Sequence, residues 1–123
     1  MSQIGWDHIQ LFTPDPEAAA AWFARHFGAT LERGANRIDA TIDGISIFVA
    51  TPPTPLCDAP EHPYRGFDHI GLRVDDLDAF VERLKANDVR FSREIFLVRP
   101  GVRACFVEGP DSISVELLER RQP

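Results

Sequence analysis

Two histidines and a glutamate stand at matching places in a chain that repeats itself. His8 lies in WDHIQL at residues 6–11, and His69 lies 61 positions later in FDHIGL at residues 67–72. Glu116 lies in ISVELL at residues 113–118. Imidazole nitrogens and carboxylate oxygens both bind divalent metal ions. These three residues are therefore candidate ligands of one metal ion that keeps open positions for a substrate.

Alternation along the predicted strands places these side chains opposite apolar rows. Residues two apart in a strand share a face. The apolar rows are Ile9 and Leu11 for His8, Ile70, Leu72 and Val74 for His69, and Ile113, Val115 and Leu117 for Glu116. We expect each apolar row to cover a helix and the reverse faces to line a common concavity. Taken singly, a histidine on a polar strand face is more commonly just solvated.

The first copy is predicted to be a βαβββ module over residues 4–50. Its segments are a strand at 4–12, a helix that runs to about residue 27, and two or three strands, the clearest at 45–49 after the turn Ile42-Asp43-Gly44. Asp15 is placed to cap the helix, Pro16 suits its first turn, and Gly28 suits its end.

The second copy, residues 67–119, repeats this order. Its segments are a strand at 67–74, a helix with the apolar stripe Leu77, Phe80, Val81 and Leu84, and strands at about 91–97, 102–108 and 113–118. Asp75 is expected to cap the helix. Repetition on this scale predicts an α+β fold in which two βαβββ modules form a curved mixed sheet around a cavity, with the helices outside.

A proline-rich segment, residues 51–66, joins the two modules within one expected domain, 1–123. It holds five of the ten prolines and shows no periodicity, which is typical of an extended connector. It could equally form a lid or an arm laid on a partner subunit. If the connector folds over the cavity, His62 and Tyr64 could act in acid–base catalysis. Otherwise they are ordinary residues of a flexible loop.

Composition narrows the class of protein. A net charge of −6 argues against nucleic-acid binding and against a polybasic membrane surface. The longest apolar run, residues 18–24, is too short to cross a bilayer, and the first residues show no export signal. Two cysteines in unlike surroundings favour reduced thiols. We therefore expect a soluble, mildly acidic, cytoplasmic protein.

Paired His-bearing βαβββ units resemble the vicinal oxygen chelate superfamily. DHIGLRVDDLDAF and GPDSISVELLE carry the likeness, which extends from about residue 4 to 119. That superfamily comprises glyoxalase I, bleomycin-resistance proteins, extradiol dioxygenases and methylmalonyl-CoA epimerase. The resemblance implies that His8, His69 and Glu116 are metal ligands for Fe²⁺, Mn²⁺, Ni²⁺ or Zn²⁺, that the metal chelates two adjacent substrate oxygens, and that the protein is a homodimer.

The fourth ligand position of glyoxalases corresponds to Phe48, which cannot bind a metal. The remaining two-His, one-carboxylate set is similar to that of extradiol enzymes, so dioxygenase chemistry is favoured. Extradiol enzymes place a tyrosine where this chain has Phe106, and they use a further histidine that His62 matches poorly. A glyoxalase- or epimerase-like lyase or isomerase, and a metal-free resistance protein, are the alternatives.

Four further residues are candidates for substrate binding. Gln10 shares a strand face with His8 and could donate a hydrogen bond to a bound oxygen. Phe48 would give the site an apolar wall that suits an organic ligand. Arg73 and Arg103 could each clamp a substrate carboxylate, or could instead form surface ion pairs.

Overall fold

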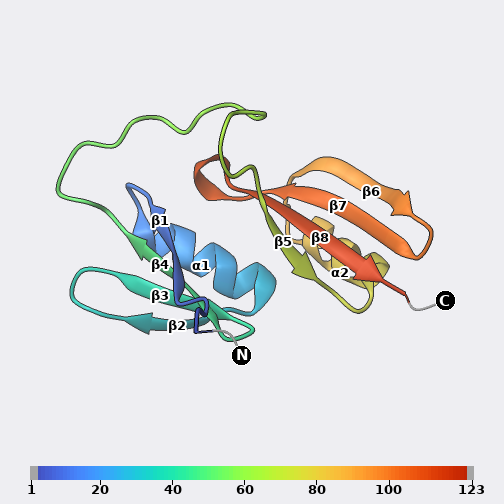
Figure 1. Ribbon diagram of the computed structural model, residues 1–123, viewed down its shortest axis with the longest axis horizontal. Coiled ribbons are helices and arrows are strands. Elements are labelled where there is room, and N and C mark those ends of the chain that lie inside the picture. The colour runs from blue at the N-terminus through green and yellow to red at the C-terminus, as the bar shows by residue number, and fades with distance from the viewer. Residues whose placement is uncertain (1–2, 122–123) are drawn as a thin grey trace. The chain divides into compact units, whose positions relative to one another are not determined.

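The computed structural model describes residues 3–121, which form two compact units. The first unit ends at Asp58 and the second begins at Ala59, so the boundary falls inside the proline-rich connector. Each unit is one mixed four-stranded sheet with one α-helix packed against it (Figure 1). The predicted α+β fold of two repeated βαβββ modules is confirmed.

The order of elements is the same in both units. The first unit contains β1 (His8–Phe12), α1 (Pro16–Phe27), β2 (Thr30–Arg33), β3 (Ile38–Ile42) and β4 (Ile45–Ala50). The second contains β5 (Ile70–Arg73), α2 (Leu77–Ala86), β6 (Phe91–Arg99), β7 (Val102–Glu108), the 3₁₀ turn η1 (Pro110–Ser112) and β8 (Ser114–Arg120). The strands of the β6–β7 hairpin are longer than those of the β2–β3 hairpin in the first unit.

Strand pairing also repeats. The sheet orders are β1-β4-β3-β2 and β5-β8-β7-β6. The pairs β1–β4 and β5–β8 are parallel, and the other pairs are antiparallel. Gln10 pairs with Phe48 in the first sheet, and Gly71 pairs with Glu116 in the second. Phe48 and Glu116 therefore occupy equivalent positions on the last strands of their modules.

Helix α1 begins and ends at the predicted residues. The Asp15 side chain accepts a hydrogen bond from the amide of Ala18 at 3.1 Å, and Pro16 opens the first turn. Gly28 ends the helix in the left-handed conformation, with φ of 69°, which glycine adopts without steric cost. The buried side of the helix includes Ala20 and Phe23, which pack on the sheet.

Helix α2 is capped by Asp76, and the prediction of Asp75 was wrong by one position. The Asp76 side chain accepts from the amide of Ala79 at 3.1 Å. A capping side chain reaches the amide three residues ahead, and the first helical residue is Leu77, so Asp75 lies one residue too early. The predicted stripe is confirmed at Leu77, Val81 and Leu84, which are buried.

Each unit has its own apolar core between helix and sheet. Buried core residues of the first unit include Ala20, Phe23, Ile38, Ala40, Ile47 and Val49, and those of the second include Leu77, Leu84, Ala104, Cys105, Val107, Val115 and Leu117. Cys105 and the exposed Cys57 form no disulfide, and burial raises the pKa of the Cys105 thiol to about 11. That thiol is unreactive at neutral pH.

A buried carboxylate ties α2 to its sheet. Glu119 on β8 is 1% exposed, and its Oε2 accepts from the Leu77 amide at 2.8 Å. Its Oε1 lies 2.9 Å from Arg103 and 3.0 Å from Arg121. The Leu77 amide, followed by the two guanidinium groups, holds the pKa of Glu119 below its ordinary value. The Glu119 carboxylate therefore stabilises the packing of α2 on its sheet.

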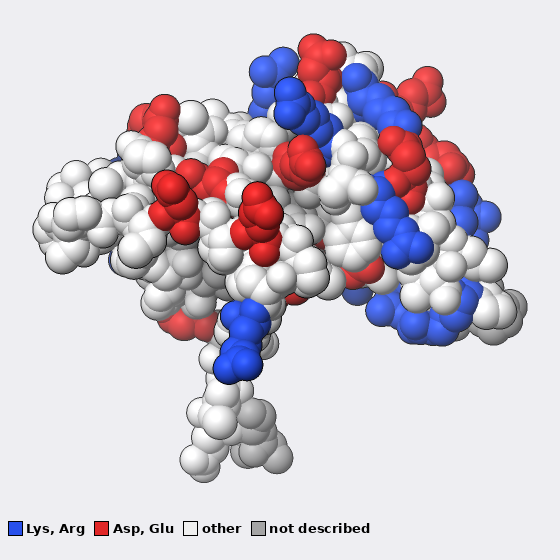
Figure 2. Space-filling model, turned by 90° about the horizontal axis from the view of Figure 1, so that it is seen from above, with Lys and Arg blue, Asp and Glu red and all other residues white. Residues whose placement is uncertain are grey.

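Charged side chains of both signs are interspersed over the face shown in Figure 2. Neither helix within residues 3–121 has the length and apolar content that a membrane-crossing helix needs.

Candidate metal and substrate site

His69 and Glu116 lie side by side in the second unit. His69 directly precedes β5, and its Nε2 is 3.3 Å from Oε1 of Glu116 on β8. The Glu116 side chain is 17% exposed, whereas its strand neighbours Val115 and Leu117 are buried on the opposite face. Gly71, which pairs with Glu116, would bring an added Cβ to 3.7 Å from that Oε1. A glycine there leaves room beside the carboxylate.

The aspartate before each histidine fixes how the imidazole is turned. Asp68 Oδ2 lies 2.8 Å from Nδ1 of His69, and Asp7 Oδ2 lies 2.7 Å from Nδ1 of His8. A carboxylate oxygen accepts, so Nδ1 carries the proton and a neutral ring keeps its lone pair on Nε2. Aspartates in this role commonly hold metal-binding histidines. Neither aspartate was among the predicted site residues, although the repeated Asp-His pair carried the signal.

In the first unit, His8 stacks on Phe48. The two ring centroids are 4.0 Å apart with an angle of 14° between the planes. The Arg37 guanidinium lies 3.5 Å from the Phe48 ring centroid and also pairs with Asp39 at 2.7 Å. Phe48 thus supports the imidazole at the position where the second module has its carboxylate. The side-chain amide of Gln10 donates a hydrogen bond to the backbone carbonyl of Phe48 at 3.0 Å.

Aromatic rings also border His69. Phe106 meets the imidazole edge-on, with centroids 5.0 Å apart, and Phe96 stacks on Phe106 at 6.2 Å. The Arg93 guanidinium lies 3.4 Å from the Phe96 ring centroid. The two phenyl rings give His69 an apolar neighbour on one side, and the Arg93 guanidinium lies against Phe96.

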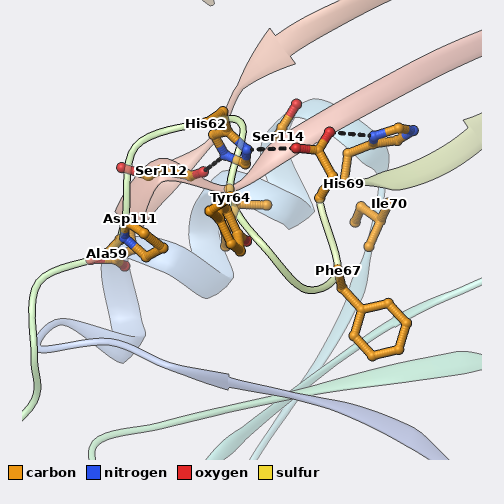
Figure 3. A pocket seen from close by; sticks show the side chains of 12 residues that line it. Ala59, His62, Tyr64, Phe67, His69, Ile70, Asp111, Ser112 and Ser114 are labelled. Atoms are coloured by element: carbon orange, nitrogen blue, oxygen red, sulfur yellow. Dashed lines mark hydrogen bonds and ion pairs between the residues drawn. The ribbon is translucent and has the colours of Figure 1, made fainter.

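Two cavities open beside Asp68 within the second unit, and His69 lines the smaller of them. The smaller, about 180 Å³, is shown in Figure 3 and is bordered by connector residues and by the η1 turn. The larger, about 850 Å³, includes Arg93 and Phe106 in its lining. Residues that line both cavities include His62, Asp68, Ser112 and Ser114. Arg93 was not among the predicted site residues, because its place in a cavity depends on the long β6–β7 hairpin.

The connector reaches this site through His62. Its Nε2 lies 2.8 Å from the Ser112 carbonyl oxygen and its Nδ1 lies 3.0 Å from Asp68 Oδ1 (Figure 3). The Ser112 carbonyl and then the Asp68 carboxylate raise the pKa of His62 above its ordinary value. Hydrogen bonds from His69 and then from His62 lower the pKa of Asp68. Tyr64 lies beside His62, with ring centroids 5.1 Å apart.

The two arginines that were predicted to bind a substrate carboxylate, Arg73 and Arg103, have different surroundings. Arg103 Nη2 is 2.8 Å from Asp78 and 2.9 Å from Glu119, so its guanidinium is used on the helix side of the sheet. Arg73 is an exposed residue at the end of β5. Neither residue lines either of the two cavities beside Asp68.

The predicted donors have the right chemistry for a divalent ion. His69 and Glu116 offer one nitrogen and one oxygen within the second unit, and His8 offers a nitrogen in the first. Within residues 3–121, no three His, Cys, Asp or Glu side chains gather closely enough to hold an ion. The second unit alone supplies two ligands, not a complete site.

Known proteins resemble this chain in sequence and in fold. A stretch of 56 residues, 45% of this chain, is 45% identical to a probable chloroplastic lactoylglutathione lyase of Arabidopsis thaliana, and spans 16% of that protein. The fosfomycin resistance protein FosX from Listeria monocytogenes has a TM-score of 0.78 at 22% identity, over 98% of this chain and 96% of that one. A glyoxalase family protein from Bacillus cereus has a TM-score of 0.76 at 18% identity, over 99% of both chains.

These structural likenesses show the fold, and the family follows from the sequence. The family model of the Glyoxalase/Bleomycin resistance protein/Dioxygenase superfamily matches residues 5–117, which include both histidine strands and the Glu116 strand. Because the match covers nearly the whole chain, this protein belongs to the glyoxalase/bleomycin resistance/dioxygenase superfamily.

Proposed function

We propose that the protein is a divalent-metal-dependent enzyme that acts on a small organic substrate with two adjacent oxygen atoms. His8, His69 and Glu116 are the proposed ligands. The observation that carries this proposal is the 3.3 Å approach of His69 Nε2 to Glu116 Oε1, with Asp68 holding the other ring nitrogen. The Asp7–His8 pair repeats the orientation in the first module.

Different side chains of the protein would have different roles at this site. Asp7 and Asp68 keep the two imidazoles turned with Nε2 available, while Phe96 and Phe106 give the site an apolar wall that displaces water from a bound ligand. Fe²⁺, Mn²⁺, Ni²⁺ or Zn²⁺ would supply Lewis-acid chemistry, and Fe²⁺ or Mn²⁺ could also bring O₂ to the substrate. Gln10 and Phe48 are proposed to contact the substrate. Arg73 and Arg103 stay proposed substrate contacts, and the Arg103 guanidinium also pairs with Asp78 and Glu119.

Dioxygenase chemistry is the favoured reaction. Phe48 takes the position equivalent to Glu116 in the first module, and its ring is stacked between His8 and Arg37. A phenyl ring neither binds a metal nor accepts a proton, so the proposed set is two histidines and one carboxylate. That set leaves coordination positions for both substrate and O₂.

A lyase or isomerase is the second candidate. It is favoured by the 45% identity to the probable lactoylglutathione lyase over 56 residues. Glyoxalase-type proton transfer uses a carboxylate where this chain has Phe48, so the second candidate needs another base.

Metal content and oxygen uptake test these proposals. We expect the untagged protein to carry one divalent ion per proposed site by elemental analysis, and its melting temperature to rise with the bound ion. Oxygen uptake with a catechol would support the dioxygenase, and its absence with turnover of a hemithioacetal would support the lyase. A protein without stoichiometric metal, whose melting temperature no added Fe²⁺, Mn²⁺, Ni²⁺ or Zn²⁺ changes, would be a metal-free binding protein.

Single substitutions identify the ligands. His8→Ala, His69→Ala and Glu116→Ala are each expected to remove stoichiometric metal, because each deletes one donor. Glu82→Gln, which removes an exposed carboxylate from α2, is the matched control and should bind metal normally. Retention of metal by His8→Ala would confine the site to the second module.

The proposal includes an assembly and a compartment. We propose a homodimer in the cytoplasm, with 1–123 acting as one functional domain. Light scattering of the purified protein tests the dimer, and a monomer at micromolar concentration would contradict it.

A further inference from the structure

His62 joins the connector to the two segments that carry the proposed ligands of the second unit. Its Nε2 contacts the Ser112 carbonyl at 2.8 Å, four residues before Glu116. Its Nδ1 contacts Asp68 Oδ1 at 3.0 Å, directly before His69. The His62 and His69 rings, both labelled in Figure 3, thus contact the same carboxylate, that of Asp68. The connector therefore reaches the site by specific hydrogen bonds.

Both ring nitrogens of His62 must donate. A backbone carbonyl oxygen only accepts, and an ionised carboxylate only accepts. The ring can keep both contacts only as an imidazolium with a proton on each nitrogen. His62 in this arrangement is therefore a cation that faces the Asp68 carboxylate.

Asp68 is shared between two histidines through different oxygens. Oδ1 faces His62 at 3.0 Å, while Oδ2 faces Nδ1 of His69 at 2.8 Å. A carboxylate held at one oxygen cannot rotate freely, so the bond from His62 fixes where the other oxygen points. The direction of that second oxygen sets the orientation of the His69 ring.

We propose that His62 is a positioning residue for His69: through Asp68 it keeps the proton of His69 on Nδ1 and presents Nε2 beside Glu116. This inference rests on the proposed function, because it gives His69 the role of a metal ligand. It assigns the proline-rich connector a part in the metal site.

The first module provides a control inside the same molecule. Asp7 orients His8 in the same way, at 2.7 Å, but its side chain is 88% exposed against 46% for Asp68. No second histidine contacts Asp7 among the hydrogen bonds and ion pairs of residues 3–121. A change at His62 should therefore alter His69 and leave His8 as it was.

Two substitutions separate the two contacts of His62. The Asn amide nitrogen stands near the place of Nδ1, so His62→Asn can still donate to Asp68. The Gln amide nitrogen stands near the place of Nε2, so His62→Gln can still donate to Ser112. If His62 acts through Asp68, Asn should rescue the orientation of His69 and Gln should not. If His62 only anchors the connector, Gln should be the better replacement.

Nitrogen-15 spectra of the imidazole rings in the metal-free protein, near neutral pH, give the direct test. We expect the His69 ring nitrogens to shift in His62→Gln toward the values of an unrestrained imidazole, and to stay in place in His62→Asn. His8 signals should not move in either variant. Unchanged His69 signals in His62→Gln, or equal shifts in both variants, would overturn the proposal.

Metal affinity gives the second readout. His62→Gln should weaken Mn²⁺ binding by about 10- to 100-fold, the usual effect of removing a group that orients a ligand histidine, while His62→Asn should stay close to wild type. Equal Mn²⁺ affinity in the two variants would overturn the role of His62 at the metal. If the wild type binds no metal, the proposed function fails, and the metal-free spectra still decide whether His62 orients His69.

Discussion

At the scale of single residues, function depends on which atom of each side chain is presented. His69 and Glu116 lie far apart in the chain, yet Nε2 and Oε1 come within 3.3 Å because β5 and β8 are neighbours in one sheet. The other ring nitrogen is taken by Asp68. One aspartate placed before a histidine thus decides which nitrogen a metal could meet.

Phe48 is predicted to stabilise the first module through its two ring contacts. Phe48→Leu removes the stacking on His8 and the contact with Arg37, and should lower the free energy of unfolding by about 1–2 kcal/mol. Chemical denaturation measures this loss. Phe12→Leu is the matched control, since Phe12 is 50% exposed and should lose less. Equal losses would show that the stacking contributes nothing.

At the scale of elements, the helices depend on side chains at their first turns. Asp15 and Asp76 each accept from the amide three residues ahead, and Glu119 accepts from the Leu77 amide at the start of α2. Amides in the first turn have no partner within the helix, so these acceptors satisfy groups that would otherwise need water. Helix α2 has two such acceptors, one local and one from β8.

Neighbouring aspartates allow a direct test of the cap of α2. Asp76→Ala should cost about 1 kcal/mol of unfolding free energy, the usual loss when a capping side chain is removed. Asp75→Ala should cost much less, because Asp75 does not cap α2. Paired denaturation curves measure the difference, and an equal or larger loss for Asp75→Ala would refute the assignment.

Glu119 gives the second unit a stability that depends on pH. Its pKa is lowered in the fold by the Leu77 amide and then by the arginines, so its contribution is present above its unfolded pKa, about 4.5, and is lost as pH falls through the lower folded value. Glu119→Gln should cost about 1–3 kcal/mol at neutral pH, because charge-assisted hydrogen bonds to a buried group are lost. The gap from wild type should narrow in acid.

The Glu119 experiment uses Glu82→Gln as its control, since that carboxylate is exposed on α2. Thermal unfolding at several pH values gives both curves. A wild-type to Glu119→Gln difference that stays constant down to strongly acid pH would contradict the role of the charge.

At the scale of the whole molecule, the connector between the modules is held by a group that titrates. His62 bonds the Ser112 carbonyl and Asp68, and Tyr64 lies beside it. The Ser112 carbonyl and then the Asp68 carboxylate raise the pKa of His62, so the attachment is complete below the unfolded value of about 6.5 and is lost as pH rises through the higher folded pKa. The connector should therefore be held more firmly in mild acid.

Amide hydrogen exchange tests this dependence. Exchange of residues 59–66, corrected for the intrinsic effect of pH, should speed up as pH rises above the folded pKa of His62. His62→Phe, which keeps a ring but cannot donate, should show fast exchange at every pH. A corrected exchange rate that does not change with pH in the wild type would contradict the attachment of the connector through His62.

Local patterns were sufficient to predict much of this protein. The repeat WDHIQL/FDHIGL predicted two modules, and the stripe of α2 and the caps Asp15 and Gly28 follow from residues close in sequence. The Asp75 cap was misplaced because two adjacent aspartates look alike until the first helical turn is known. The ion pairs of Arg103 could not be predicted from the sequence, because Asp78 and Glu119 contact it only when α2 packs on the sheet.

The sequence by itself determined the two modules with their helices and strands, since periodicity and capping act over a few residues. Only the tertiary structure decided that Glu116 meets His69, that Asp68 is shared with His62, and that Phe48 stacks on His8. Those contacts depend on strand register and on the path of the connector, which arise when distant segments pack together.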